Sequence, residues 1–194
     1  MHTVVPQLLM RAYEINPDLY TDGQLNIPES GNDIPDLLDE ALWGVAAWEA
    51  LQDDDGGVRM GVESYRHPLY SHANYDEDPY WTYTKDANTS ARAAGIFAQA
   101  ARLVEEYDQT ASDRLKKEAI DAYNYAVAND ASDYFMFYAS GELYRLTKRA
   151  VYKNYFEAAW ERGASLPWDF PNLAEFQLQM SDYIGGDPQG AMPD

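Results

Sequence analysis

The sequence has 194 residues and a formal net charge of −19, the balance of 33 acidic and 14 basic side chains. That charge would repel nucleic acids and anionic membrane surfaces, so neither is an expected partner. The chain has no cysteine, which excludes disulfides and thiolate metal sites. No apolar run approaches the roughly 20 residues that span a bilayer, and residues 1–6 lack the basic region of a signal peptide. A 46% hydrophobic and 14% aromatic content predicts one folded domain.

Apolar residues recur at helical spacing from the start of the chain. A first helix is predicted over residues 3–15, with Val4, Leu8, Leu9, Ala12 and Tyr13 on its buried side. A second follows Asp33, which is placed to cap it, with Asp36 in a capping-box position. Its buried stripe runs through Leu37, Leu38, Ala41, Leu42, Val45, Trp48 and Leu51. A turn rich in aspartate and glycine, residues 53–57, ends this helix.

The second half of the chain is also predicted to be helical. Ser90 is the predicted N-cap of a helix that reaches residue 107, and its many small residues permit close packing of neighbouring helices. Further helices are predicted over residues 113–128, 133–147, 150–162 and 173–184. These seven helices, with essentially no strand signal, predict an all-α fold of antiparallel helical hairpins.

Alternate loops of such hairpins lie on opposite faces. The long loop 53–89 follows the second helix and the aromatic loop 165–172 follows the sixth, so both are expected on one face. Long loops in compact domains are more often functional than short ones. The sequence therefore predicts a binding surface at that end of the bundle.

Aromatic side chains crowd the two loops on this face. Flat rings pack against sugar rings while phenols and imidazoles bond the hydroxyls, which predicts a carbohydrate cleft. An alternative stays open, in which Tyr65, Tyr80 and Tyr83 only pin the loop to the body and Trp168 plugs the bundle end. The candidate substrate-binding residues are Trp81, Tyr80, His72, Tyr75 and Trp168.

No metal site, catalytic residue or cofactor is predicted within the chain. His67 and His72 lack ligands at the usual spacing, and the turn 53–57 lacks the later ligands of a calcium loop. A further group of carboxylates lies at or beside the loop on the other face, where helix caps and surface ion pairs are the expected roles. These are Glu29, Asp36, Asp39 and Glu40.

One stretch carries a resemblance to a known family. Residues 28–40 read PESGNDIPDLLDE, Trp43 follows on the helix, and residues 52–58 read QDDDGGV. This pattern resembles glycoside hydrolase family 9, made largely of cellulases, with Asp33 where the family usually has glycine. Residues 139–145, ASGELYR, resemble a second family segment, and Lys148 replaces its glycine. The resemblance extends over most of the chain to about residue 160.

The resemblance implies a part of an (α/α)6 toroid, which in that family is built of six helical hairpins. It also implies cleavage of β-1,4-glucan by inversion, which needs a carboxylate base and a carboxylic acid on either side of the bond. The family supplies the base from a DAGD-type loop before the first helix and the acid near the C-terminal end of the domain. No DAGD occurs in the sequence.

The expectation is therefore that residues 1–194 are a single partial catalytic domain truncated at both ends. Such a chain would be inert alone, because both catalytic carboxylates lie outside it. Its exposed apolar helix faces would pack against the rest of the domain or against a second copy. The implied substrate is a β-glucan or oligosaccharide, and the implied location is secreted or periplasmic.

Two other functions stay open from the residues. A polysaccharide lyase or sugar epimerase on an α/α toroid would need a Tyr/His/Arg centre, for which Arg66, His67 and His72 are available. A non-catalytic helical scaffold could bind glycans or peptides. The lack of a fixed repeat period counts against the scaffold, and the lack of catalytic loops counts for it.

Overall fold

The computed structural model describes residues 3–65, 75 and 77–162, and within these it confirms the all-α prediction. None of the described helices has the length and apolar character needed to cross a bilayer. The predicted helix 173–184 and the aromatic loop 165–172 lie outside the described residues. The elements are α1 (Val4–Ile15), the 3-10 helix η1 (Pro17–Leu19), α2 (Asp36–Glu49), strands β1 (Val62–Ser64) and β2 (Tyr80–Thr82), α3 (Ala87–Val104), α4 (Gln109–Ala128), α5 (Asp133–Thr147) and α6 (Ala150–Glu161).

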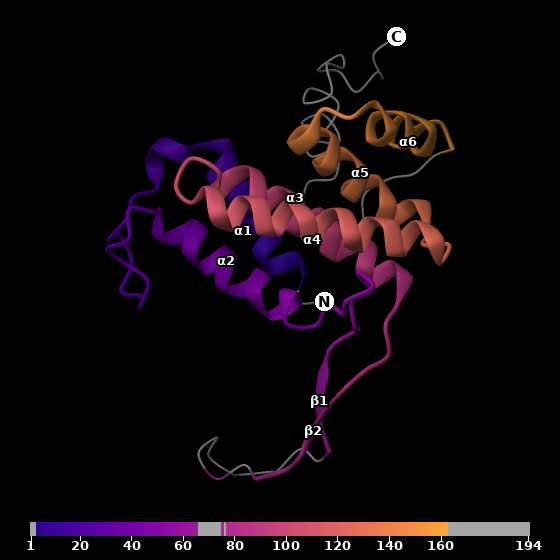
Figure 1. The fold of residues 1–194 in the computed structure, drawn as a ribbon. Helices are drawn as coiled ribbons and strands as arrows, with labels where there is room; N and C mark the ends of the chain where they lie inside the picture. Colours follow the sequence, from indigo (N-terminus) through magenta and orange to yellow (C-terminus); the bar gives the residue numbers. More distant parts are fainter. Residues whose placement is uncertain (1–2, 66–74, 76, 163–194) are drawn as a thin grey trace.

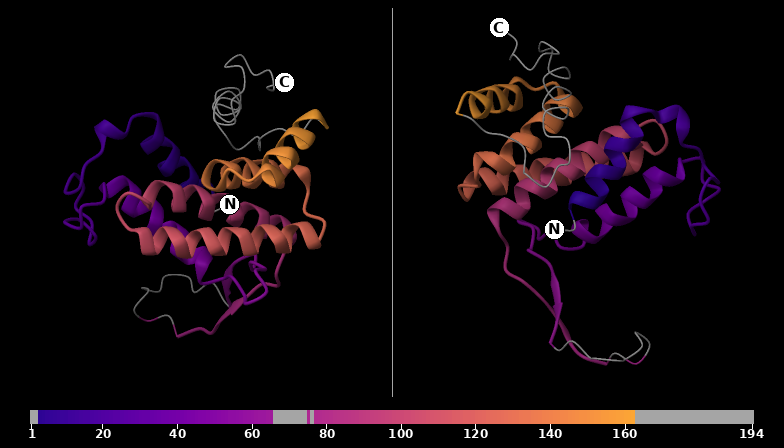
Figure 2. Two further views of the ribbon diagram at one scale, coloured as in Figure 1. Left: turned by 45° about the horizontal axis from the view of Figure 1, so that its top comes forward. Right: turned by 180° about the vertical axis from the view of Figure 1, so that it is seen from behind.

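The helices form three hairpins that lie side by side (Figure 1). The pairs are α1 with α2, α3 with α4 and α5 with α6, and α3 also contacts both α1 and α5. The strands pair antiparallel and extend away from the helices as a thin arm, which Figure 1 and the right view of Figure 2 show. Strand content is small, as the sequence indicates, since each strand has only three residues.

Helix α3 lies at the centre of the core and is buried along most of its length. Its small residues let α5 approach closely. At Gly95 an added Cβ would lie 2.2 Å from the ring of Tyr138 on α5, so only glycine fits there. The predicted stripe of α2 is confirmed at Leu38, Ala41, Val45 and Trp48, which are buried, and Leu115 on α4 is buried as well.

Helix α1 departs from its predicted pattern. Its buried residues include the polar side chains Gln7 and Arg11, whereas the predicted Leu8 and Leu9 are only partly buried. Near the C-terminal end of α1, Glu14 forms a hydrogen bond or an ion pair with each of three side chains of α3 and α5. These are Gln99 Nε2 at 2.7 Å, Arg102 Nη2 at 2.6 Å and Arg145 Nη2 at 2.6 Å. Apolar periodicity cannot detect a buried face made of paired charges.

Three predicted helix starts also need correction. Helix α3 begins at Ala87, where the Asp86 carboxylate caps Thr89 N–H, and buried Ser90 instead accepts from Val58 N–H. Helix α4 begins at Gln109 under a cap from Asp108 rather than at residue 113. At α2 the capping position is held by Pro35 with no side-chain cap. Short polar side chains before a helix compete for the capping role, and sequence alone does not decide among them.

The alternation of loop faces is confirmed by contacts at both ends of the bundle. The Tyr13 and Tyr107 hydroxyls lie 2.7 Å apart, which joins the end of α1 to the turn after α3. At the other end, Ser132 N–H donates to Asn88 Oδ1 at 2.9 Å, which joins the turn after α4 to the start of α3. The strand pair connects α2 to α3 and therefore belongs to the second end.

Candidate sugar-binding hairpin and apolar groove

The turn that follows α2 fixes the root of the strand pair against α4. Gly56 has a φ of +85°, and an added Cβ there would lie 2.3 Å from the Asp121 carbonyl oxygen. At Gly57 an added Cβ would lie 2.6 Å from the Tyr125 ring. Gln52 Nε2 donates to the carbonyls of Gly56 and Glu118 at 3.1 and 3.0 Å. The aspartate and glycine turn follows the end of α2, as predicted, and it also forms a structural mount for the strand pair, since its glycines are required by packing against α4.

Ion pairs hold the two arms of the hairpin at this mount. Arg59 donates to both Asp53 oxygens at 3.0 and 2.8 Å, and Lys85 lies 2.5 Å from Asp55. Arg59 and Lys85 face each other in an isolated β-bridge at the root. The hydrogen bonds from Arg59 hold the pKa of Asp53 below its ordinary value. A bidentate pair fixes the relative orientation of its two side chains. The Arg59–Asp53 pair therefore helps to set the direction in which the strands leave the helices.

The strand register separates the predicted sugar contacts. Val62 pairs with Thr82, Glu63 with Trp81 and Ser64 with Tyr80. Directly opposed side chains share a face of a two-stranded ribbon, and successive side chains alternate between faces. Trp81 therefore lies on the face of Glu63, whereas Tyr80 lies on the opposite face. The sequence placed these two aromatics in one cleft, but the hairpin does not bring them together.

The face that carries Trp81 has a defined polar arrangement. The rings of Trp81 and Tyr83 lie 4.5 Å apart at 60°, and the Tyr83 hydroxyl donates to Glu63 Oε2 at 3.2 Å. Burial, and then the neighbouring Glu63 carboxylate, raise the pKa of the Tyr83 phenol. Trp81 keeps 45% of its surface exposed. An exposed indole beside a carboxylate and a phenol is a composition suited to sugar rings.

The remaining predicted contacts are either highly exposed or outside the described residues. Tyr80 is 61% exposed and Tyr75 is 76% exposed. His72 and Trp168 lie outside the described residues, as do Arg66 and His67. Glu63 was not predicted as a site residue. The aromatic and β-branched residues from Tyr80 to Tyr83 are typical of a strand, but no local pattern indicates that this strand pairs with Glu63.

Two of the four carboxylates predicted at the surface of the other end of the bundle are buried instead. Asp36 has no exposed surface and accepts from Gly23 N–H, Leu25 N–H and the Ser30 hydroxyl. Asp39 is also buried and accepts from Asn32 Nδ2 at 3.1 Å. These residues fold the loop before α2 back onto the helix start, which corrects the prediction of surface ion pairs. Among the described residues, no group of three or more His, Asp or Glu is placed to hold a metal ion.

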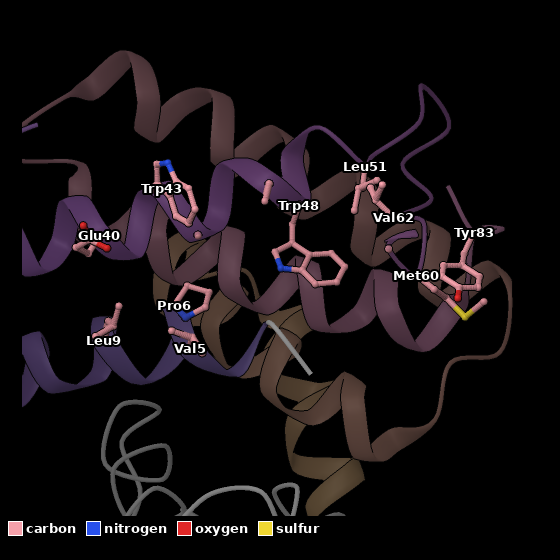
Figure 3. A pocket seen from close by; sticks show the side chains of 13 residues that line it. Val5, Pro6, Leu9, Glu40, Trp43, Trp48, Leu51, Met60, Val62 and Tyr83 are labelled. Carbon is pink, nitrogen blue, oxygen red and sulfur yellow. The ribbon is translucent and has the colours of Figure 1, made fainter. Parts of the chain in front are cut away.

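An apolar groove of about 540 Å³ lies beside the hairpin root (Figure 3). Its walls come from α1, from α2 and Leu51 shortly after its end, from residues 60–62 at the start of β1, and from Tyr83, which follows β2. Trp43, on the outer side of α2, is 70% exposed, and Glu40 is the one acidic side chain in the lining. The apolar lining includes Val5, Pro6, Leu9, Trp43, Trp48, Leu51, Met60, Val62 and Tyr83.

No family model matches the chain. A cellulose 1,4-beta-cellobiosidase of Acetivibrio thermocellus is 32% identical over 184 residues, which takes in 76% of this chain and 20% of that protein. Endoglucanase C of Cellulomonas fimi is 31% identical over 134 residues, 64% of this chain and 11% of that protein. The chain thus spans about a fifth or less of the length of these relatives.

Solved structures extend the likeness to the fold. A metagenome-derived glycoside hydrolase family 9 endoglucanase superposes with a TM-score of 0.83 at 29% identity, covering 96% of this chain and 38% of that one. A thermostable endoglucanase from Alicyclobacillus acidocaldarius shares the fold with a TM-score of 0.75 over 100% of this chain and 40% of its own.

The helical hairpins, the sequence likeness to the two cellulases and the likeness to the solved endoglucanase structures point to one fold class. The chain forms part of an (α/α)6 toroid of the carbohydrate-active enzymes. The chain belongs to glycoside hydrolase family 9.

Proposed function

We propose that this chain is part of the catalytic domain of a glycoside hydrolase that cleaves a β-1,4-glucan by inversion. The observation that supports it most directly is the likeness, at 29% identity and a TM-score of 0.83 over 96% of the chain, to a family 9 endoglucanase. Inversion requires two carboxyl groups about 6.5–9.5 Å apart. We assign both to segments outside this chain, because no DAGD occurs in its sequence.

In this proposal the long loop after α2 binds substrate. Trp81 supplies the main stacking surface, and Tyr80, Tyr75, His72 and Trp168 supply further contacts along the glucan. Exposed aromatic faces cover the apolar faces of sugar rings, which supports the assignment of Trp81 in particular. The mount formed by Gly56, Gly57 and the Arg59–Asp53 pair gives the hairpin a fixed direction, as a binding element needs.

Titration of the chain with cellohexaose tests the substrate assignment. We expect binding by the unchanged chain and at least a tenfold loss on Trp81→Ala, since covering a large apolar side chain contributes about 1.5–3 kcal/mol. Trp43→Ala removes another exposed tryptophan, outside the strands, and should leave the affinity unchanged. No binding by the unchanged chain, or equal losses in both variants, would contradict the assignment.

A second experiment tests the location of the catalytic carboxylates. The purified chain should release no product from cellohexaose or from an aryl β-glucoside. Hydrolysis above that of a mock preparation would show that an acid and a base lie within the 194 residues, and the proposal would then be wrong on this point.

The apolar groove supports a further part of the proposal, which concerns partners. We infer that the rest of the catalytic domain, or a second copy of the chain, covers the groove around Trp43 and Val62. Apolar surface of this extent is commonly an interaction site. Because a polymeric glucan is met outside the cytoplasm, we also propose that the protein acts in a secreted or periplasmic setting.

A further inference from the structure

We propose that Glu63 binds the hydroxyl groups of the sugar that stacks on Trp81, and so sets how the glucan lies along the hairpin. The proposal rests on the assignment of a β-glucan substrate to this loop. It concerns one face of the strand pair, formed by Glu63, Trp81 and Tyr83, which we call the Trp81 face.

The register places Glu63 at the edge of the indole. Glu63 on β1 is the direct partner of Trp81 on β2, so both side chains rise from the same face of the ribbon. Tyr83 lies two residues from Trp81, directly after β2, and its ring packs 4.5 Å from the indole. Its hydroxyl donates to Glu63 Oε2 at 3.2 Å. The carboxylate is therefore held beside the stacking surface by a residue that also touches that surface.

The chemistry of a β-linked glucose ring fits this arrangement. Its hydroxyls are equatorial and point outward in the plane of the ring, so a ring that lies flat on Trp81 directs them at the flanking side chains. A carboxylate can accept several hydrogen bonds at the same time. Hydrogen bonds to an ionised acceptor are stronger than those between neutral groups. Glu63 is thus suited to fix the ring in one orientation.

Tyr83 has a positioning role in this proposal. It donates to the carboxylate from a phenol that stays protonated, because burial and Glu63 both raise its pKa. Tyr83 therefore acts on the sugar through Glu63. Tyr80, on the opposite face, cannot contribute to the same ring while that ring lies on Trp81.

Calorimetric titration of the whole chain with cellohexaose tests the proposal. Glu63→Gln keeps the size of the side chain and can still accept from Tyr83, but removes the charge. We expect it to weaken binding about tenfold, as for the loss of a charge-assisted hydrogen bond. Tyr83→Phe should weaken binding less, and should add little to the effect of Glu63→Gln in the double variant, because Tyr83 acts through Glu63. Glu105→Gln, the same change at an exposed site after α3, is the matched control and should bind as the unchanged chain does.

The outcomes separate this inference from the proposed function. If the unchanged chain does not bind cellohexaose, the substrate assignment is wrong and Glu63 has no sugar to bind. If the chain binds and Trp81→Ala abolishes binding, but Glu63→Gln binds normally, only the role of Glu63 is overturned. A lower unfolding temperature of Glu63→Gln with unchanged affinity would assign Glu63 a structural role and would also overturn the proposal.

Discussion

Arg145 on α5 donates from Nη2 to Glu14 on α1 at 2.6 Å, across 131 positions of sequence. The same arginine donates from Nη1 to Glu142 at 2.8 Å, and Arg102 on α3 lies 2.6 Å from Glu14 and 3.1 Å from Glu142. Two acids and two bases thus alternate among three helices, one from each hairpin. Burial works to raise the pKa of Glu14, but the two guanidiniums outweigh it and hold that pKa below its ordinary value. The network fixes the relative positions of the three hairpins.

Arg145→Met should therefore destabilise the chain strongly. It leaves Glu14 and Glu142 buried with one cation between them, and removing one partner of a buried pair costs about 3–5 kcal/mol. Urea unfolding followed by far-ultraviolet circular dichroism gives the loss. Arg162→Met is the control, since Arg162 makes a comparable pair with Asp133 at 2.6 Å in an exposed position, where about 1 kcal/mol or less is expected. Equal losses in the two variants would contradict a special role for the buried network.

A second carboxyl group gives the stability of the chain a pH dependence near neutrality. Glu118 on α4 is partly buried beside Glu49 on α2, and burial and then Glu49 raise its pKa to about 7. Arg114 lies 2.9 Å from Glu49 and 4.0 Å from Glu118. Arg114 and Lys117 both lower the pKa of Glu118, but they offset the effects of burial and Glu49 only in part. From its ordinary pKa of 4.5 up to about 7, the folded chain keeps a proton that the unfolded chain has released. The free energy of unfolding therefore falls as the pH rises through this window.

Glu118→Gln should remove that dependence. Above pH 7 the variant should be more stable than the unchanged chain by about 1–2 kcal/mol, a value reduced for screening by solvent. Below the ordinary pKa the two should agree, because both side chains are then neutral. Unfolding curves at pH 4.5, 6 and 8 measure the difference. An advantage of the same size at every pH would mean that glutamine packs better and that no proton is involved.

The helical part of this fold could be predicted from the sequence because its signal is local. The stripe through Leu38, Val45 and Trp48 repeats at helical spacing and is buried as expected. The end of α5 could also be predicted from local sequence. Lys148 takes a left-handed φ of +56° at the predicted corner, where the resembled family has glycine. Apolar spacing and turn residues are properties of neighbouring positions, so they can be read without tertiary structure.

The candidate site was predicted less completely because its geometry depends on pairing across the chain. Trp81 and Tyr80 are adjacent in sequence, but the pairing of residues 62–64 with 80–82 assigns them to opposite faces. The same pairing brings Glu63 to Trp81, a contact that no local pattern indicates. The buried charges of Glu14 and Arg145 were missed for a similar reason, since their partners come from other helices.

Gly95→Ala should test how closely α3 and α5 pack. The new methyl group would lie 2.2 Å from the Tyr138 ring, which must then move, although its hydroxyl is held 2.6 Å from Gln99 Oε1. Overpacking of this kind costs about 1–3 kcal/mol, against a small gain in helix propensity. Thermal unfolding should show a lower midpoint. Ala94→Gly, one position away, is a useful comparison because it should destabilise through lost burial and propensity while Tyr138 keeps its position.

Trp43→Ser should reduce self-association of the chain if a second copy covers the apolar groove. Trp43 exposes 70% of its surface in the groove wall, and burial of such a side chain stabilises an interface by about 1.5–3 kcal/mol. Sedimentation over a range of concentrations should therefore show a dissociation constant at least tenfold higher for the variant. Leu19→Ser changes another exposed apolar side chain, outside the groove, and should leave the constant unchanged. A chain that sediments as a monomer at all concentrations would exclude a second copy, and the rest of the catalytic domain would then be the partner to test on this surface.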